Sequence, residues 1–338
     1  MHTSTYSLRQ SRRVLLGAVV LSLTTLSACG GQDEEPVTVG LITKQEDNPY
    51  WVTMREVAED TASAQDVTLF TETGESDVDV DSQVTAIEAM VEEGADGILI
   101  APTDSTELVP AIEAAREAGV TVIAVDTPVQ PQSAVDAFYA TDNLRAGELV
   151  GRYAAAKVNE LGLDPQVAML NLAPGISSGE LRSEGFLAGF GVGAEDPQIV
   201  GSADTQGNQE LAKTAMADLL ADSPDINVVY TVNEPAAFGA LEALNDADAN
   251  LDDVVVVSVD GGCEAIKNGV RAGDIDATAQ QFPENMAREG VSAIADEVRG
   301  GATPSGFLDT GVELITGDPA PGVSSQDVAF GVRNCWGD

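Results

Sequence analysis

Short apolar runs alternate with longer amphipathic segments from Val37 to the end of the chain. Residues 37–43 and 120–125 are almost continuously apolar, which is typical of buried strands. Residues 84–91 instead repeat their apolar side chains at helical spacing. Strands are expected at residues 37–43, 67–70, 97–100, 120–125, 167–172, 227–232, 254–259 and 276–281 and near Phe138. Further helices are expected at residues 51–64, 108–118 and 143–161 and near 181–190.

This alternation predicts an α/β fold with parallel sheets. Strands that are apolar on both sides are buried on both faces, as happens when the helices between them cover a parallel sheet. The number of strand–helix units exceeds what one doubly wound sheet holds, so we expect two Rossmann-like lobes. The length of 338 residues agrees with about two domains of roughly 150 residues each.

The first 28 residues have the pattern of an export signal. Three arginines precede the apolar run 14–26, which is too short to span a hydrocarbon core of ~30 Å but suits a signal peptide. The segment Leu26-Ser27-Ala28-Cys29 resembles the lipobox of bacterial lipoproteins, which implies lipidation of Cys29 and a tether at residues 29–36. The alternative is an ordinary signal peptide with an incidental cysteine.

Charge and histidine content narrow the function. The chain has 56 acidic and 16 basic residues and a net charge of −40, so it would repel a phosphate backbone, and we expect no nucleic-acid partner. The single histidine, His2, lies in the signal segment. Removal of that segment would leave neither histidine catalysis nor histidine-ligated metal.

The cysteines predict one cross-link. With Cys29 lipidated, Cys263 and Cys335 remain. An even pair of cysteines in an oxidising compartment is a disulfide candidate.

Ligands of open α/β sheets bind beyond the carboxyl ends of the strands. The residues expected there are amides, single carboxylates, hydroxyls and two adjacent aromatics, without a nucleophile paired to a base. Such groups can chelate vicinal hydroxyls and stack on a sugar ring. They include Thr43, Asn48, Tyr50, Trp51, Asp126, Thr127, Asn233, Asp260 and Gln281. Tyr50 and Trp51 could instead be core residues that begin a helix. Arg182, at the start of another predicted helix, is a further candidate for the site, and its alternative is a surface arginine in an ion pair.

Residues 175–179 match the G-x-S-x-G pattern of a serine nucleophile. A serine nucleophile needs a general base, and none is expected nearby. We therefore interpret this segment as a loop that caps the following helix.

An acidic cluster fits a calcium-loop register. Asp77, Asp79, Asp81 and Glu88 occupy its positions 1, 3, 5 and 12, but position 6 is Ser82 where glycine is needed. The alternative is an acidic loop that caps the helix after it. The sequence leaves open whether these residues bind a cation.

Several of these segments together carry a family resemblance. They are 39–44, 48–51, 125–128, 140–143, 205–208, 229–237, 257–263 and 334–337. With them the chain, from about residue 37 to 318, resembles the type I periplasmic binding proteins of the ribose-binding group. Within that group it looks closest to fructose-type substrate-binding lipoproteins of ABC transporters.

The resemblance implies a set of ligand contacts. They are Asn48, Tyr50, Trp51, Asp126, Arg182, Asn233, Asp260 and Gln281. Three positions depart from the ribose binders, since Ala101 replaces an asparagine, Thr127 an arginine and Gly207 a stacking phenylalanine. Further candidates for ligand contact are Thr43, Lys44, Thr127, Gln206 and Asn208, of which Gln206 or Asn208 could fill the space left at residue 207.

The resemblance also implies the domain organisation. One lobe would comprise residues 37–140 and 282–310, and the other residues 141–281 and 311–338. The chain would cross a hinge near residues 141, 281 and 310. The lobes of such proteins close over their ligand by a hinge motion.

These points predict a monomeric receptor outside the cytoplasm, lipid-anchored to the outer face of the cell membrane or periplasmic. Its ligand would be a neutral monosaccharide, fructose or a related hexose, delivered to an ABC transporter permease. We expect no enzymatic activity, cofactor or metal. The alternatives are a receptor for a pentose, polyol or signalling sugar, and a sugar-responsive transcription regulator. A regulator would need a basic DNA-binding segment, whereas residues 30–36 are acidic.

Overall fold

The computed structural model describes residues 36–337, and its first sheet is built from six strands of this part of the chain. Their order is β11-β5-β4-β3-β1-β2, and every neighbouring pair is parallel. The strands are β1 (Val37–Thr43), β2 (Val67–Thr73), β3 (Gly97–Ile100), β4 (Thr121–Val125), β5 (Ala137–Ala140) and β11 (Gly306–Asp309). The central strands β3 and β4 are almost entirely buried, as their apolar runs predict.

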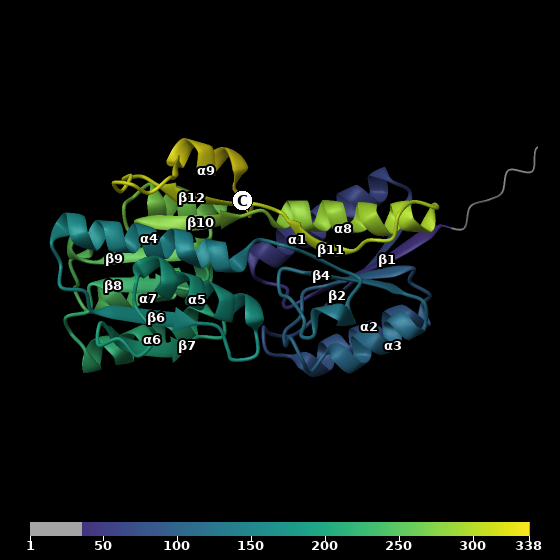
Figure 1. Ribbon diagram of the computed structural model, residues 1–338, viewed down its shortest axis with the longest axis horizontal. Helices are drawn as coiled ribbons and strands as arrows, with labels where there is room; N and C mark the ends of the chain where they lie inside the picture. Colours follow the sequence, from purple (N-terminus) through teal and green to yellow (C-terminus); the bar gives the residue numbers. More distant parts are fainter. Residues whose placement is uncertain (1–35, 338) are drawn as a thin grey trace, which may run out of the picture. The chain divides into compact units, whose positions relative to one another are not determined.

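Helices cover both faces of the first sheet. α1 (Pro49–Ala64) lies beside α8 (Pro283–Val298), and α2 (Val80–Glu92) beside α3 (Val109–Glu117) on the other face (Figure 1). α1 buries Trp51, Met54 and Ala58, which lie on one side of the helix because they are three or four residues apart. A short 3₁₀ turn (Gln132–Ala134) precedes β5.

The second sheet has seven strands within the described residues, in the order β13-β12-β10-β9-β8-β6-β7. The strands are β6 (Val167–Asn171), β7 (Ile199–Asp204), β8 (Val228–Thr231), β9 (Val255–Asp260), β10 (Ala277–Gln281), β12 (Val312–Thr316) and β13 (Gln326–Asp327). Its helical segments are α4 (Asn143–Leu161), α5 (Ser177–Phe190), α6 (Gln209–Asp222), α7 (Glu234–Asp246), a 3₁₀ turn (Leu251–Asp253), a π-helix (Ala265–Val270) and α9 (Val328–Asn334).

Strand alternation divides the apolar core of the second sheet into two layers. Met169 packs in the cluster that contains side chains of α4 and α5. Its neighbours Ala168 and Leu170 pack in the cluster that contains side chains of α6 and α7. Successive side chains of a strand point to opposite faces, so one apolar strand serves both layers.

The chain passes three times between the two sheets. It leaves the first sheet after β5, returns between β10 and α8, and leaves again between β11 and β12. These passages lie at about residues 141, 282 and 310. The predicted two-lobe α/β fold with parallel sheets is therefore confirmed.

Three features differ from the sequence prediction. β12 pairs antiparallel with β10, so the second sheet is mixed at that edge. Helix α5 begins at Ser177, four residues before the expected start, and the serines of the G-x-S-x-G pattern form its first turn. The strands β7, β11, β12 and β13 and the helix α9 were not predicted.

The C-terminal segment is joined to the loop after β9. A disulfide connects Cys263 to Cys335, whose Cα atoms are 4.8 Å apart. The backbone N–H of Cys263 also donates to the carbonyl of Trp336 at 2.8 Å. The structure thus contains the cross-link that the cysteine count suggests.

The expected signal peptide at residues 1–28, the lipidation at Cys29 and nearly all of the tether at residues 29–36 lie outside the described residues. Among residues 36–337, no helix combines the length and apolar character that crossing a membrane requires.

Candidate functional site

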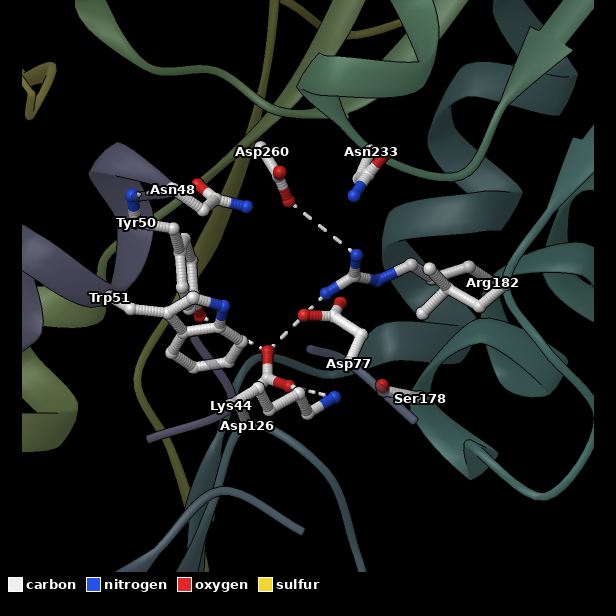
Figure 2. A pocket seen from close by; sticks show the side chains of 11 residues that line it. Lys44, Asn48, Tyr50, Trp51, Asp77, Asp126, Ser178, Arg182, Asn233 and Asp260 are labelled. Carbon is white, nitrogen blue, oxygen red and sulfur yellow. Dashed lines mark hydrogen bonds and ion pairs between the residues drawn. The ribbon is translucent and has the colours of Figure 1, made fainter. Parts of the chain in front are cut away.

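A polar pocket lies where loops of both sheets meet (Figure 2). Its lining consists of Lys44, Asn48, Tyr50, Trp51, Asp77, Asp126, Leu172, Ser178, Arg182, Asn233 and Asp260. The cavity measures about 20 Å³, which is room for about one water molecule. A larger ligand would enter only after the walls move apart.

Strand ends and helix starts position these side chains. Lys44 directly follows β1, Asp126 directly follows β4, and Asp260 is the last residue of β9. Asn48 and Asn233 are the N-caps of α1 and α7, and each accepts a backbone N–H bond of its helix. The pocket therefore sits at the carboxyl ends of parallel strands, where the sequence places it.

The two central carboxylates both belong to residues with a positive φ angle. Asp126 has φ 62° and Asp260 has φ 103°, a region that residues with a Cβ rarely adopt. Such strain persists where the surrounding structure holds a side chain in place, and it is concentrated at functional sites. The backbone thus turns one carboxylate from each sheet into the same pocket.

Arg182, on α5, connects these carboxylates. Its guanidinium lies 3.5 Å from a carboxylate oxygen of Asp126 and 3.5 Å from one of Asp260. It also donates to the side chains of Asn143 at 2.7 Å and Gln281 at 3.1 Å, and to the carbonyl of Val232 at 3.1 Å. Because Asp126 and Asp260 lie at the ends of strands of different sheets, this arginine bridges the two lobes.

Lys44 is the second cation of the pocket and is 1 % exposed. Its Nζ donates to Thr127 Oγ1 at 3.0 Å and lies 3.6 Å from Asp126 Oδ2. The ammonium is also 5.5 Å from the ring centre of Trp51, within range of a cation–π interaction. All of these partners belong to the first lobe.

An aromatic cluster forms one wall. Tyr50 meets Trp51 edge to face at 4.8 Å between ring centres and meets Trp336 in the same way at 5.2 Å. The hydroxyl of Tyr50 donates to Asp126 Oδ1 at 3.2 Å. The indole Nε1 of Trp51, in contrast, is buried without a hydrogen-bond partner.

Burial and charge shift several pKa values in the pocket. Burial raises the pKa of Asp260 above its ordinary range, against the opposing effect of Arg182. Burial alone would lower the pKa of Arg182, but the carboxylates of Asp260 and Asp126 raise it. Behind Asp260, burial and the charge of Asp260 raise the pKa of Glu234 to about 7. The carboxylates of the second lobe are therefore closely coupled.

The structure brings seven of the eight principal predicted contacts to the pocket wall. The eighth, Gln281, lies one layer behind, where it accepts from Arg182 and donates to Asp260 Oδ1 at 2.6 Å. Lys44 lines the pocket, and Thr127 lies beside it, bonded to Lys44 and Asp126.

The structure does not place three other candidates in the wall. Thr43 lines a separate cavity, together with residues of β2 and with Arg55 of α1. Gln206 and Asn208 are exposed, because the turn at Gln206 (φ 51°) directs the chain outward and Asn208 caps α6. The space beside Gly207 is occupied by Asn233, Leu172 and Asp77 instead.

Sequence reasoning missed three lining residues, namely Asp77, Leu172 and Ser178. Two of them had signals that were interpreted otherwise. Asp77 belonged to the calcium-loop register, but it is only 5 % exposed and turns into the pocket, while Asp79 caps α2. Within the described residues no cluster of ligands suited to a metal is found.

Ser178 belonged to the serine-nucleophile pattern. Its Oγ lies 2.8 Å from Thr127 Oγ1, and that of Ser177 donates to the carbonyl of Pro128 at 2.9 Å. Both hydroxyls thus connect α5 to the loop after β4. The expected capping loop is not found here, because both serines lie in the first turn of α5 and its N-cap, Ile176, makes no side-chain hydrogen bond.

Two lobes with a polar pocket between their strand ends define a binding protein of the periplasmic type. The chain belongs to the periplasmic binding protein family, whose domain matches residues 39–302. The chain is 29% identical to the D-ribose/D-allose-binding protein of Pseudomonas aeruginosa, over 91% of this chain and 99% of that protein. It is 28% identical to the ribose import binding protein of Bacillus subtilis, over 83% of this chain and 92% of that protein.

A solved structure agrees with these relatives. It is an ABC transporter solute-binding protein of Mycobacterium smegmatis with bound glycerol, 30% identical, with a TM-score of 0.73. The match covers 82% of this chain and 93% of that protein.

Proposed function

We propose that the protein is the substrate-binding component of an ABC importer and binds a neutral monosaccharide between its lobes. The observation that carries this proposal is the pair of carboxylates, Asp126 and Asp260, that face one pocket beside Arg182 and an aromatic wall. Carboxylates, amides and a guanidinium form paired hydrogen bonds with vicinal hydroxyls, and an aromatic face packs on the sugar ring. The names of the relatives, which refer to ribose and allose import or binding, support the same class.

The proposed ligand is a hexose such as fructose, with a pentose or polyol as the second candidate. Ala101, Thr127 and Gly207 replace larger groups of the ribose binders that the chain resembles, which favours a different fit. The ammonium of Lys44, 3.0 Å from Thr127 Oγ1, supplies a positive charge near the position of the replaced arginine. Allose, itself a hexose, is also compatible with this pocket.

The same proposal includes the organisation of the protein. Residues 37–140 and 282–310 form one moving lobe and residues 141–281 and 311–338 the other. The cavity of about 20 Å³ is too small for a sugar, so the lobes separate to admit it and close around it. The protein acts outside the cytoplasm as a monomer anchored through Cys29, performs no chemistry and delivers the sugar to a permease.

A thermal-shift screen tests the ligand class. Fructose, allose, ribose, a sugar alcohol and sugar phosphates are added singly, and the best ligand is then measured by calorimetry. A ligand at 100 times its dissociation constant adds about 2.7 kcal/mol of stability. If no neutral sugar or polyol stabilises the protein, the proposed function is wrong.

Two variants test the pocket. Asp126→Ala and Asp260→Ala each remove an acceptor and leave ligand hydroxyls unpaired, so we expect no measurable sugar binding by either folded variant. Asp60→Ala, which removes an exposed carboxylate of α1, is the matched control and retains binding. Near-native affinity in either pocket variant would place the ligand elsewhere.

Phosphate esters provide a second criterion. The pocket has three carboxylates against Lys44 and Arg182, and its loops offer no glycine-rich anion cradle. Desolvating a phosphate there without full pairing is unfavourable. We therefore expect fructose 6-phosphate to bind far more weakly than fructose at matched ionic strength, and equal affinity would contradict the assignment.

A further inference from the structure

Two polar groups of the pocket retain unused hydrogen-bonding capacity. Trp51 is 4 % exposed, and its Nε1–H has no partner. Figure 2 shows this nitrogen turned towards Asp77 and Arg182. A buried donor without a partner is unfavourable, and native proteins contain few of them.

Asp77 presents the complementary acceptor. Its Oδ1 accepts from Gln45 Nε2 at 2.9 Å, whereas its Oδ2 makes no hydrogen bond with any described residue. The carboxylate lies in the loop between β2 and α2 and reaches the pocket wall. Burial raises the pKa of Asp77, and the ammonium of Lys44 opposes this shift.

Gly207 in the second lobe makes this position of Asp77 sterically allowed. A Cβ at residue 207 would lie 3.1 Å from Asp77 Oδ2 and 2.8 Å from Asn233 Nδ2. Gly207 also has φ 66°, which favours glycine. Because residue 207 has no side chain, the Asp77 carboxylate of the first lobe can pack closely against the backbone of Gly207 in the second lobe.

Arg182 and Asp260 already have partners in the pocket. Arg182 donates to Asn143 and Gln281, and Asp260 accepts from Gln281. A ligand must therefore displace existing contacts to use either of these groups, but not to use Trp51 Nε1 or Asp77 Oδ2.

We propose that Asp77 and Trp51 contact the ligand directly and determine which sugars the pocket accepts. Trp51 Nε1 donates to a ligand oxygen, and Asp77 Oδ2 accepts from a ligand hydroxyl. This inference rests on the proposed function, because it concerns a polyhydroxy ligand of the same pocket. A ligand that lacks the matching hydroxyl leaves Asp77 Oδ2 without a partner and binds about tenfold more weakly, or worse.

The experiment combines protein variants with deoxy sugars. Calorimetry measures the best sugar of the thermal-shift screen and each of its available monodeoxy analogues with wild type, Asp77→Asn and Trp51→Phe. Asp77→Asn keeps the shape and an acceptor for Gln45, and Trp51→Phe keeps a ring but removes the N–H donor. Asp79→Asn, a change at the helix cap outside the pocket, is the matched control.

We expect each pocket variant to lose tenfold or more in affinity for the parent sugar, and the control to change by less than twofold. For one deoxy position, removal of the hydroxyl and Asp77→Asn should have non-additive effects, because both delete the same contact. Additive effects at every position, or native affinity in both folded pocket variants, would overturn the inference. The proposed function would still stand in that case, because it depends only on sugar binding by the wild type.

A folding failure does not prevent the test. Melting temperatures identify variants that do not fold, and each of the two substitutions gives an independent answer. If no neutral sugar or polyol binds to wild type, the proposed function fails, and this inference fails with it.

Discussion

The two buried cations of the pocket, Lys44 and Arg182, carry the same charge but are held in different ways. Arg182 donates to side chains and a carbonyl and spans both carboxylates, one from each sheet. Lys44 makes one hydrogen bond, to Thr127, and one longer ion pair to Asp126 within its own lobe. The planar guanidinium of an arginine has five N–H donors in a fixed geometry and suits such a bridge. The ammonium of a lysine is a compact group with three N–H donors, of which Lys44 uses one for its hydrogen bond.

This difference indicates that the two cations have different roles. Arg182 compensates two buried carboxylates and connects the lobes in this closed arrangement. Lys44 has two further N–H donors and is the cation that a ligand can engage at lower cost. Substitutions of the two cations test these roles, because the free energy of unfolding and the affinity for sugar can be measured separately for each variant.

Arg182→Met should have the largest effect. It leaves Asp126 and Asp260 buried near one another without the guanidinium, so the free energy of unfolding should fall by about 3–5 kcal/mol. Urea denaturation followed by circular dichroism measures this change. Arg152→Met removes an exposed arginine of α4 paired with Glu148 and should alter stability by no more than about 0.5 kcal/mol. Similar values for both variants would refute the bridging role.

The pH dependence of stability should show a smaller effect from the second lobe. Glu234 has its pKa raised from 4.5 to about 7, chiefly by burial and then by Asp260. The folded state therefore holds this proton more tightly, and the associated stability is complete below pH 4.5 and is lost as the pH rises through about 7. The loss amounts to about 3 kcal/mol.

Glu234→Gln should remove this component, so that the difference in unfolding free energy between wild type and variant changes between pH 4.5 and 7. Glu242→Gln on the same helix is the control. The pKa of Glu242 is lowered by its hydrogen bonds to Gln209 and Lys213, so its contribution is lost as the pH falls. A flat difference for Glu234→Gln would show that this carboxyl titrates normally.

Lys44→Met should have the smallest effect on stability. It removes one hydrogen bond and leaves Asp126 with Arg182, Tyr50 and Thr127, so we expect a loss of about 1–2 kcal/mol. Sugar affinity, measured by calorimetry, should nevertheless fall at least about tenfold. A loss of stability as large as that of Arg182→Met would mean that the two cations share one role.

The arrangement of strands and helices could be predicted because it depends on local patterns. Apolar runs in the sequence predict the buried strands. The polar residues at the ends of these strands, Asp126, Asn233 and Asp260, are thereby predicted to be neighbours in space, as they are in the pocket. The direction of β12 could not be predicted in this way, because it depends on how the chain returns after its third crossing.

The pocket residues that escaped prediction depend on distant contacts. The acidic loop contains Asp77 and Asp79 two positions apart, and only the approach of Gly207, far along the chain, gives Asp77 a place in the pocket. The family resemblance located the loop of Gln206 and Asn208, but it does not specify which way a tight turn directs its side chains. Local spacing identifies loops at the site, and tertiary contacts select the residues that enter it.

The C-terminal segment has a consequence for the rate at which the pocket exchanges its contents. Cys335 is covalently joined to the loop of Asp260, while the next residue, Trp336, packs in the core of the first sheet against Tyr50. Its Nε1 donates to the carbonyl of Gln281 at 3.0 Å. If the lobes separate as proposed, movement of Tyr50 away from Asp260 requires Trp336 to leave the core of the first lobe or strains its covalent link to the second. We therefore expect the cross-linked tail to slow both capture and release of a ligand.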